Sequence, residues 1–292
     1  MSHAPLPMPL PALFVSHGSP MLAIEPGATG AFFARLGPAI EAGFGRPRAI
    51  VVVSPHTAAP QPVVLDTPTH HAVHDFGGFP EALYRLRYDP PGEPAVAQRV
   101  VELLTAAGLR PVRSAEAGLD HGIWAVLRFA WPQADIPVVP VALSPQQSPA
   151  AQWALGEALA PLRAEGVLLL ASGSLTHDLR RLFAVRPMPA TDAREIAETA
   201  AFRAWVAERS AARDRAALLD YRRVAPYGAA MHPTDEHWLP FYIAAGAGGF
   251  DTAPVRLHEG VTYGSLAMDA YAFGAGAARL AELSGRAPPA AG

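Results

Sequence analysis

Three short apolar runs in this chain each end in a turn, and a histidine follows each of them closely. The runs and their turns occupy residues 13–20, 50–57 and 167–178, and the histidines are His17, His56 and His177. Continuous apolar runs bounded by Gly, Pro and Ser are typical of buried parallel strands. Because ligands of an open α/β sheet bind beyond the carboxyl ends of its strands, we expect the three histidines to meet at one sheet edge.

Helical spacing of apolar residues separates these runs. Helices are predicted over residues 29–44, 94–107, 121–130, 148–164 and 191–219, and from Thr234 to about residue 245. Pro38 predicts a kink or break in the first helix, and Thr191 or Asp192 is a candidate N-cap for the 191–219 stretch, which we expect to form two helices. Further strands are predicted at 60–65 and 136–144, with two strands, or a strand and a helix, between 252 and 273.

This alternation of strands and helices predicts an α/β fold. We expect a single domain over residues 12–283, with a central sheet that is mostly parallel or mixed and with helices on both of its faces. Residues 1–11 are expected to form a flexible N-terminal tail, and residues 284–292 a frayed C-terminal tail.

The residue composition narrows the chemistry. The chain has 292 residues, none of them cysteine, and all 23 basic residues are arginine. Thiolate catalysis, disulfides, cysteine metal sites and enzymes that form a Schiff base through lysine are therefore excluded. A formal net charge of −3 gives no electrostatic footprint for nucleic acid or for an anionic membrane, so we expect a small-molecule partner.

The N-terminal segment is rich in proline and lacks the basic region of a signal peptide. No apolar run approaches the roughly 18 residues of a membrane span. We therefore expect a cytoplasmic protein without a membrane partner. Hydrophobic loop residues could cover either a pocket or a subunit contact, so a homo-oligomer stays open.

The histidines point to a metal site at the carboxyl ends of the strands. A single histidine beside a turn is more often a cap or hydrogen-bond partner, but three or four are hard to explain in that way. Neutral imidazoles so arranged can form a shallow mononuclear site for Fe, Zn or Mn. Serines such as Ser16, Ser54 and Ser172 lie near the same edge, but the Gly-x-Ser-x-Gly elbow of serine hydrolases is missing.

Residues 69–80 form an unusual loop with three histidines, two phenylalanines and a Gly-Gly pair, which predicts a mobile part of a binding surface. The carboxylates nearest to histidines in sequence are Asp75, Asp120 and Glu236. We favour an interpretation in which Asp120 caps a helix and Glu236 lies in the first turn of one. The alternative makes one of the three an orienting partner of a histidine.

Seven motifs together resemble the class III (LigB-type) extradiol ring-cleavage dioxygenases, and specifically their 4,5-DOPA-dioxygenase-like branch. They are Ser-His-Gly-Ser-Pro (16–20), Ser-Pro-His-Thr (54–57), His-Asp-Phe-Gly-Gly-Phe-Pro (74–80), Asp-His-Gly-Ile-Trp (120–124), Gly-Ser-Leu-Thr-His-Asp-Leu (173–179), His-Pro-Thr-Asp-Glu-His (232–237) and His-Glu-Gly-Val-Thr-Tyr-Gly-Ser-Leu (258–266). They follow the family's order over residues 12–274.

The resemblance implies a role for each matching residue. It makes His17, His56 and His232 the metal ligands, with Glu236 a less favoured substitute, and His177 the catalytic acid/base. His121 is implied to hydrogen-bond the substrate, and the neighbouring motif residues expected to bind it are His74, Phe76 and Ser19.

The implied reaction is the opening of a catechol such as DOPA by O2, inserted beside the diol to give a ring-opened semialdehyde. His177 would accept a phenolic proton and later return it. The resemblance implies one divalent metal per chain, Fe(II) for activity or Zn(II) as in some relatives. Zn(II) has no accessible redox change, so a zinc form should bind a catechol without activating oxygen.

Two other functions remain open from the residues. One is a zinc-dependent hydrolase in which His177 shuttles protons, and it predicts activity without oxygen. The other is a non-catalytic metal- or ligand-binding protein on the same scaffold.

Overall fold

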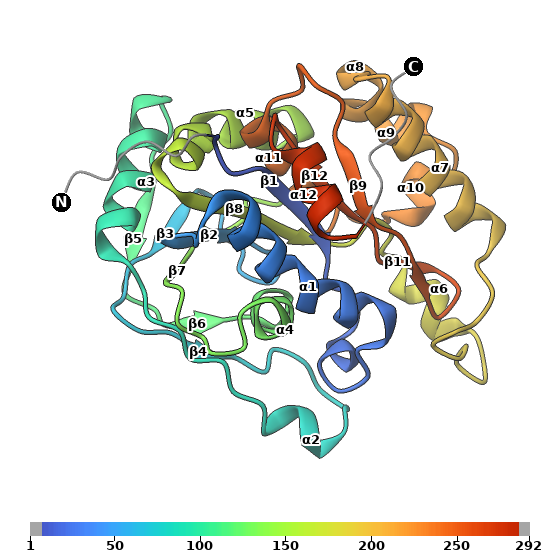
Figure 1. Ribbon diagram of the computed structural model, residues 1–292. Coiled ribbons are helices and arrows are strands. Elements are labelled where there is room, and N and C mark those ends of the chain that lie inside the picture. The colour runs from blue at the N-terminus through green and yellow to red at the C-terminus, as the bar shows by residue number, and fades with distance from the viewer. Residues whose placement is uncertain (1–7, 286–292) are drawn as a thin grey trace.

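The structure, a computed structural model that describes residues 8–285, is built around a six-stranded mixed sheet (Figure 1). In spatial order the strands are β7 (Val138–Pro140), β2 (Ala49–Val53), β8 (Val167–Gly173), β1 (Ala12–Ser16), β12 (Ala270–Phe273) and β9 (Val255–His258). The first four are parallel, and β12 and β9 are added antiparallel. Strand β8 pairs with both β2 and β1, so the three histidine-bearing strands are neighbours, as the sequence predicts.

The central strands are buried on both faces, which is why they are continuously apolar rather than alternating. In β8, Leu168 and Leu170 belong to one hydrophobic core, and Val167, Leu169 and Ala171 belong to the other. Successive side chains of a strand point to opposite faces, so this single run contributes to both cores.

Helices cover both faces of the sheet and confirm the predicted α/β architecture. One core is closed by α3 (Pro94–Ala106), α5 (Pro149–Leu159), α7 (Ala197–Ala211) and α11 (Leu239–Gly248). The other is closed by α1 (Gly27–Phe44), α4 (His121–Ala130) and α12 (Ala277–Leu283). Shorter helices are α2 (Glu81–Tyr84), α6 (Leu179–Ala184), α8 (Arg215–Leu219), α9 (Tyr221–Val224) and α10 (Gly228–Met231), with 3-10 turns η1 (Pro20–Ala23) and η2 (Ala160–Glu165).

Three two-stranded sheets hold the loops. They pair β3 (Val63–Leu65) with β5 (Val112–Ser114), β4 (His71–Ala72) with β6 (Gly118–Leu119), and β10 (Val261–Thr262) with β11 (Leu266–Ala267). The β4–β6 pair ties the histidine-rich loop to the start of α4. The loop is thus anchored at one end, whereas the sequence predicts it to be mobile.

Several local predictions are wrong. Helix α1 continues through Pro38 without a break, because its apolar face stays packed on α4, with Gly37 so close to the Ala130 carbonyl that a Cβ atom would lie 2.1 Å from it. The N-cap of α7 is Ile196 rather than Thr191 or Asp192. The preceding segment instead pairs with the β10–β11 hairpin, where Tyr263 N–H donates to Thr191 O and Ile196 N–H to Gly264 O.

Two more differences concern the last quarter of the chain. Residues 252–273 contain four strands, and helix α11 starts at Leu239, after the irregular segment that follows Thr234. At the N-terminus Leu10 is fully buried, and the Arg163 guanidinium donates to its carbonyl at 2.6 Å, so the packed chain begins before residue 12. The remaining parts of the predicted tails, residues 1–7 and 286–292, lie outside the described residues. Within residues 8–285, no helix combines the length and hydrophobicity that crossing a membrane requires.

Candidate metal centre and active-site cavity

Three imidazoles converge beyond the carboxyl ends of β1, β2 and β8. The Nε2 atom of His56 lies 3.2 Å from Nε2 of His17 and 3.2 Å from Nε2 of His237. The rings of His17 and His237 are almost completely buried, whereas 24% of the His56 side-chain surface is exposed. The cluster therefore has two inner members and one at the solvent side, and its ring nitrogens could together hold one metal ion.

The protonation of His17 follows from its hydrogen bonds. The Ser172 hydroxyl donates its proton to the Gly122 carbonyl at 2.5 Å, so it can only accept from His17 Nδ1, 2.9 Å away. With the proton on Nδ1, the lone pair of the neutral ring is on Nε2 and faces the other two histidines. Ser172 belongs to β8 and His17 follows β1, so strand pairing fixes this tautomer.

A carboxylate lies beside Nδ1 of each of the other two rings. Nδ1 of His237 lies 3.2 Å from Glu236 Oε1, and Nδ1 of His56 lies 3.4 Å from Asp75 Oδ2. A carboxylate beyond the second ring nitrogen is the usual support of a metal-binding histidine. The interpretation that left Glu236 in the first turn of a helix is wrong, because α11 begins three residues later.

Electrostatics keep the three rings neutral. Burial lowers the pKa of His17 and of His237, and the neighbouring histidines lower both further. Burial also lowers the pKa of His56 to about 4, and His121 adds to that effect while Asp75 opposes it. The lone pairs of three neutral ring nitrogens repel one another at this distance unless a cation lies between them. Their 3.2 Å spacing matches the roughly 3.0 to 3.4 Å between ligands that lie about 2.1 Å from one ion, so the residues fit a divalent metal.

His232 does not join this cluster, which corrects the predicted ligand set. Its Nε2 donates to the Leu175 carbonyl at 2.8 Å, and the ring is enclosed by Phe202 and Trp238. The side chain is fully buried, with Nδ1 unpaired within the described part of the chain. His237, five residues further in the same motif, occupies the third position instead. In the sequence, His237 is marked only by its place as the second histidine of the His-Pro-Thr-Asp-Glu-His motif.

His177 lies beside the cluster rather than in it. Its ring stacks on that of His237, with centroids 3.4 Å apart and planes within 10° of parallel. The backbone N–H of His177 donates to Met231 O at 2.8 Å, which holds the turn after β8 against the segment that carries His237. Burial lowers the pKa of His177 to about 4, although Glu236 and Asp178 oppose the shift, so the ring is neutral near pH 7.

Asp75 orients His121. Its carboxylate accepts from His121 N–H at 2.9 Å and from His121 Nδ1 at 3.0 Å, which leaves Nε2 of that ring for other partners. Burial raises the pKa of Asp75, but the bonds from His121 outweigh it, so the net pKa is lowered and the group is ionised. Asp120 is the N-cap residue of α4, as predicted, but its side chain forms no capping hydrogen bond with the helix. It accepts instead from Ser54 and Thr57 of the β2 turn at 2.8 and 2.6 Å.

A cavity of about 330 Å³ opens over these histidines. Among the described residues, its wall includes the predicted His17, His56, His121, His177, Ser19 and Phe76, together with Phe79 and His237. His74 is not part of this wall. Its Nε2 contacts the Leu86 carbonyl at 3.1 Å and its ring packs on Tyr84 and Trp124, so it supports Phe76 from behind.

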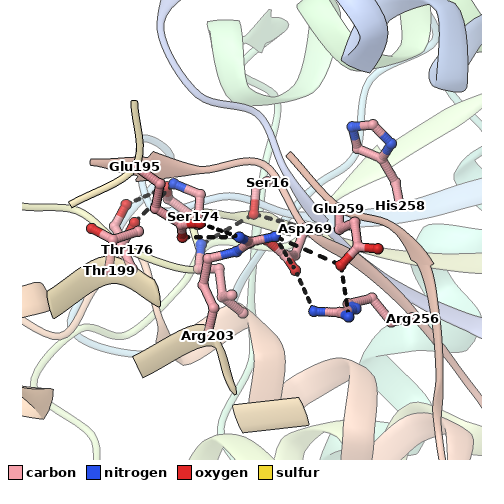
Figure 2. Close-up of polar contacts among 12 residues, drawn as sticks. Ser16, Ser174, Thr176, Glu195, Thr199, Arg203, Arg256, His258, Glu259 and Asp269 are labelled. Atoms are coloured by element: carbon pink, nitrogen blue, oxygen red, sulfur yellow. Dashed lines mark hydrogen bonds and ion pairs between the residues drawn. The ribbon is translucent and has the colours of Figure 1, made fainter. Parts of the chain in front are cut away.

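An ion network centred on the buried Asp269 holds the end of β1, next to His17 (Figure 2). Ser16 N–H and Oγ both contact the Asp269 carbonyl, at 3.2 and 2.8 Å. The Asp269 carboxylate is fully buried and accepts from Arg203 Nε at 2.8 Å. Arg203 also binds Glu195, and Arg256 binds Glu259 and Asp269, so helix α7 and strands β9 and β12 are joined at this point.

Known proteins resemble the chain over most of its length. Residues 11–274 match the family described as the catalytic LigB subunit of aromatic ring-opening dioxygenase. The 4,5-DOPA dioxygenase extradiol of Escherichia coli is 38% identical, over 89% of this chain and 93% of its own, and the protein of that name from Beta vulgaris is 34% identical, over 89% and 95%. The solved structure of an uncharacterized protein from Escherichia coli K12 superposes with a TM-score of 0.73 at 31% identity, covering 91% of this chain and 100% of that one.

These matches confirm the resemblance that the seven motifs indicate. The family match covers all of the strands of the central sheet and the three segments that carry His17, His56 and His237. The protein belongs to the LigB family and is an aromatic ring-opening dioxygenase.

Proposed function

We propose that this protein is a metal-dependent extradiol dioxygenase that opens the ring of a catechol beside its diol. The observation that carries the proposal is the convergence of the Nε2 atoms of three neutral imidazoles, each with an oxygen atom of a neighbouring side chain beside its Nδ1, on the floor of an aromatic-lined cavity. His17, His56 and His237 would hold one divalent ion. Bound Fe(II) would supply the redox change needed to use O2, which Zn(II) lacks.

His177 is proposed as the acid/base. Its lowered pKa makes the neutral ring available at pH 7 to accept a proton from the substrate diol. The nearby carboxylates of Glu236 and Asp178 would stabilise the ring once it is charged, which favours the return of that proton later in the reaction. Stacking on His237 keeps the ring at the edge of the cluster.

Two further groups are proposed to position the catechol. His121 donates a hydrogen bond from Nδ1 to Asp75, so Nε2 of the neutral ring can accept a hydrogen bond from a substrate hydroxyl. Phe76 lies with its ring centroid 5.7 Å from that of His121 and offers an apolar face to a flat substrate. Ser19 also lines the cavity and is proposed to contact the substrate.

The test is oxygen uptake by protein that has been stripped of metal and reloaded anaerobically with either Fe(II) or Zn(II). Catechol, 4-ethylcatechol and DOPA serve as substrates, with metal content measured in parallel. Uptake with Fe(II) and a new yellow product, but none with Zn(II), is the expected result. Turnover of an ester or amide by the zinc form without oxygen would favour the hydrolase instead.

A further inference from the structure

His232 is a buried histidine whose ring makes one hydrogen bond within the described part of the chain. The ring lies among those of Phe202, Tyr221 and Trp238. Its Nε2 donates to the Leu175 carbonyl at 2.8 Å. Burying an imidazole among aromatic rings costs free energy that an apolar side chain would not cost. The bond to Leu175 is therefore what distinguishes this histidine from an apolar residue in the same place.

Leu175 is held from both sides. Its N–H donates to Ser16 Oγ at 3.1 Å, and its carbonyl accepts from His232. The Ser16 hydroxyl donates its own proton to the Asp269 carbonyl at 2.8 Å, so it is oriented to accept from Leu175 (Figure 2). Ser16 is the last residue of β1 and His232 follows α10, so the segments that lead to two of the candidate metal ligands meet at Leu175.

The ring of His177 depends on this turn for its position. Among residues 8–285 the ring makes no hydrogen bond, and it stacks on His237 with centroids 3.4 Å apart. Its backbone is held by Leu175, two residues earlier, and by the bond from its own N–H to Met231 O at 2.8 Å. A gap of about 0.5 to 1 Å forfeits a quarter to a half of the attraction between contacting atoms, so a shift of the Leu175 backbone would loosen the stack.

We infer that His232 is a positioning residue that holds the ring of His177 against His237. It does so through the Leu175 carbonyl, while Ser16 holds the N–H of the same residue. The inference rests on the proposed function for the acid/base role of His177. Loss of the bond removes neither a ligand of the Nε2 cluster nor a residue of the cavity wall. The expected signature is a lower kcat with unchanged KM and metal content.

Two substitutions separate the hydrogen bond from the bulk of the ring. His232→Leu removes the donor and keeps an apolar side chain, whereas His232→Gln offers an amide N–H as many bonds from Cα as Nε2. In Fe(II)-loaded protein with catechol as substrate, His232→Leu should lower kcat by about ten- to a hundredfold, because a misplacement of about 1 Å has an effect of that size. His232→Gln should recover most of the loss. An unchanged kcat in His232→Leu would overturn the inference.

His70 provides a matched control. Its ring is also buried, its Nε2 contacts the Val138 carbonyl at 2.9 Å, and its Nδ1, like that of His232, has no partner among the described residues. It lies outside the wall of the active-site cavity. His70→Leu should lower the free energy of unfolding as His232→Leu does, because each leaves a buried carbonyl unpaired, but kcat should stay near that of the unaltered protein. An equal loss of kcat in both variants would contradict the positioning role.

A double-mutant cycle shows whether His232 acts through His177. Once His177→Ala has removed the acid/base, His232→Leu should change kcat by no more than about twofold, because residues that act as a unit are not additive. A further loss as large as in the unaltered background would make the role of His232 structural. Ser16→Ala removes the partner at the other end of Leu175 and should give the same pattern, also if His232→Leu fails to fold. Full kcat or loss of metal in Ser16→Ala would overturn the inference.

A measurement without turnover separates this inference from the proposed function. In Zn(II)-loaded protein with isotope-labelled histidines, the stack predicts that the ring-proton NMR signals of His177 are shifted upfield by His237. The shift should be lost in His232→Leu and kept in His232→Gln. If no catechol is cleaved but the shift behaves in this way, the reaction is wrong and the positioning stands. If cleavage requires His177 but neither the shift nor kcat depends on His232, the reaction stands and the positioning is wrong.

Discussion

The ring of His177 lies parallel to that of His237, with the two centroids 3.4 Å apart. This contact places a neutral imidazole directly beside the candidate metal ligands without adding a fourth nitrogen to the Nε2 cluster. A group in this position can exchange a proton with a bound diol while the ligands stay in place. The two histidines come from different turns, one after β8 and one before α11.

His177→Ala should separate proton transfer from metal binding. We expect kcat to fall by about a hundredfold or more, because the acid/base group is lost, while the bound metal stays near one per chain. Oxygen uptake and metal analysis on the same preparation measure both. Activity within a few-fold of the unaltered protein would remove His177 from the acid/base role.

His237 and His232 form a matched pair for the metal assignment. His237→Ala should abolish stoichiometric metal, because it removes one of three converging nitrogens. His232→Asn should keep it, because among the described residues the ring hydrogen-bonds the Leu175 carbonyl alone, and an amide can donate there instead. Metal content after dialysis distinguishes them, with circular dichroism to verify folding. Loss of metal from the His232 variant alone would restore the ligand set predicted from sequence.

Ser172 should affect metal affinity through its hydrogen bond with His17. Ser172→Ala removes the acceptor of the His17 Nδ1 proton, so metal affinity should fall by about ten- to a hundredfold without loss of a ligand. Competition with a chelator gives the affinity. Ser144→Ala is the control, because Ser144 is also buried but its hydroxyl has no partner among the described residues. An equal effect of both substitutions would indicate a general loss of stability.

Phe76 should act on the substrate rather than on the metal. Phe76→Ala is expected to raise KM for catechols by about tenfold, because an apolar wall of the cavity is lost, with metal content unchanged. His74→Ala should have a smaller effect on KM, since His74 contacts Phe76 from outside the cavity. A larger effect of His74→Ala would show that the loop contacts the substrate differently.

The metal-free protein should lose stability in acid. Burial lowers the pKa of His232 to about 3, against about 6.5 in the unfolded chain, although its bond to Leu175 opposes the shift. Between these values the unfolded state binds more protons, so the free energy of unfolding falls as pH falls, by up to about 1.4 kcal/mol per pH unit for one histidine. Burial depresses the pKa of His56 and His177 as well, each to about 4, so they add to the slope.

Urea unfolding of metal-free protein at pH 7 and pH 5 measures this dependence. The His232→Asn variant should show a shallower slope, because it can take up one proton fewer on unfolding. An identical slope in the variant would mean that His232 is not held neutral by burial.

The order and type of the main elements could be predicted from the sequence. Within 13–20, 50–57 and 167–178, the strand residues before each turn are almost continuously apolar because the parallel strands are covered on both faces, so their pattern identifies them locally. Neighbouring parallel strands end at one edge, and this is why His17, His56 and His177 could be placed together.

The third member of the cluster depended on the tertiary structure. His232 and His237 lie in an irregular segment between α10 and α11, where no period fixes the direction of a side chain. The Leu175 carbonyl and the Phe202 ring, both remote in sequence, enclose His232 together with the nearby ring of Trp238, and His237 takes the place in the cluster.

The same holds for the groups that orient the ligands. Asp75 contacts His121 across 46 residues of sequence, and Ser172 contacts His17 across 155. The sequence alone determined the strands and which histidines follow them, because burial on both faces leaves a local pattern. Only the tertiary structure decided which ring nitrogens face one another, because hydrogen bonds between distant segments leave no local pattern in the sequence.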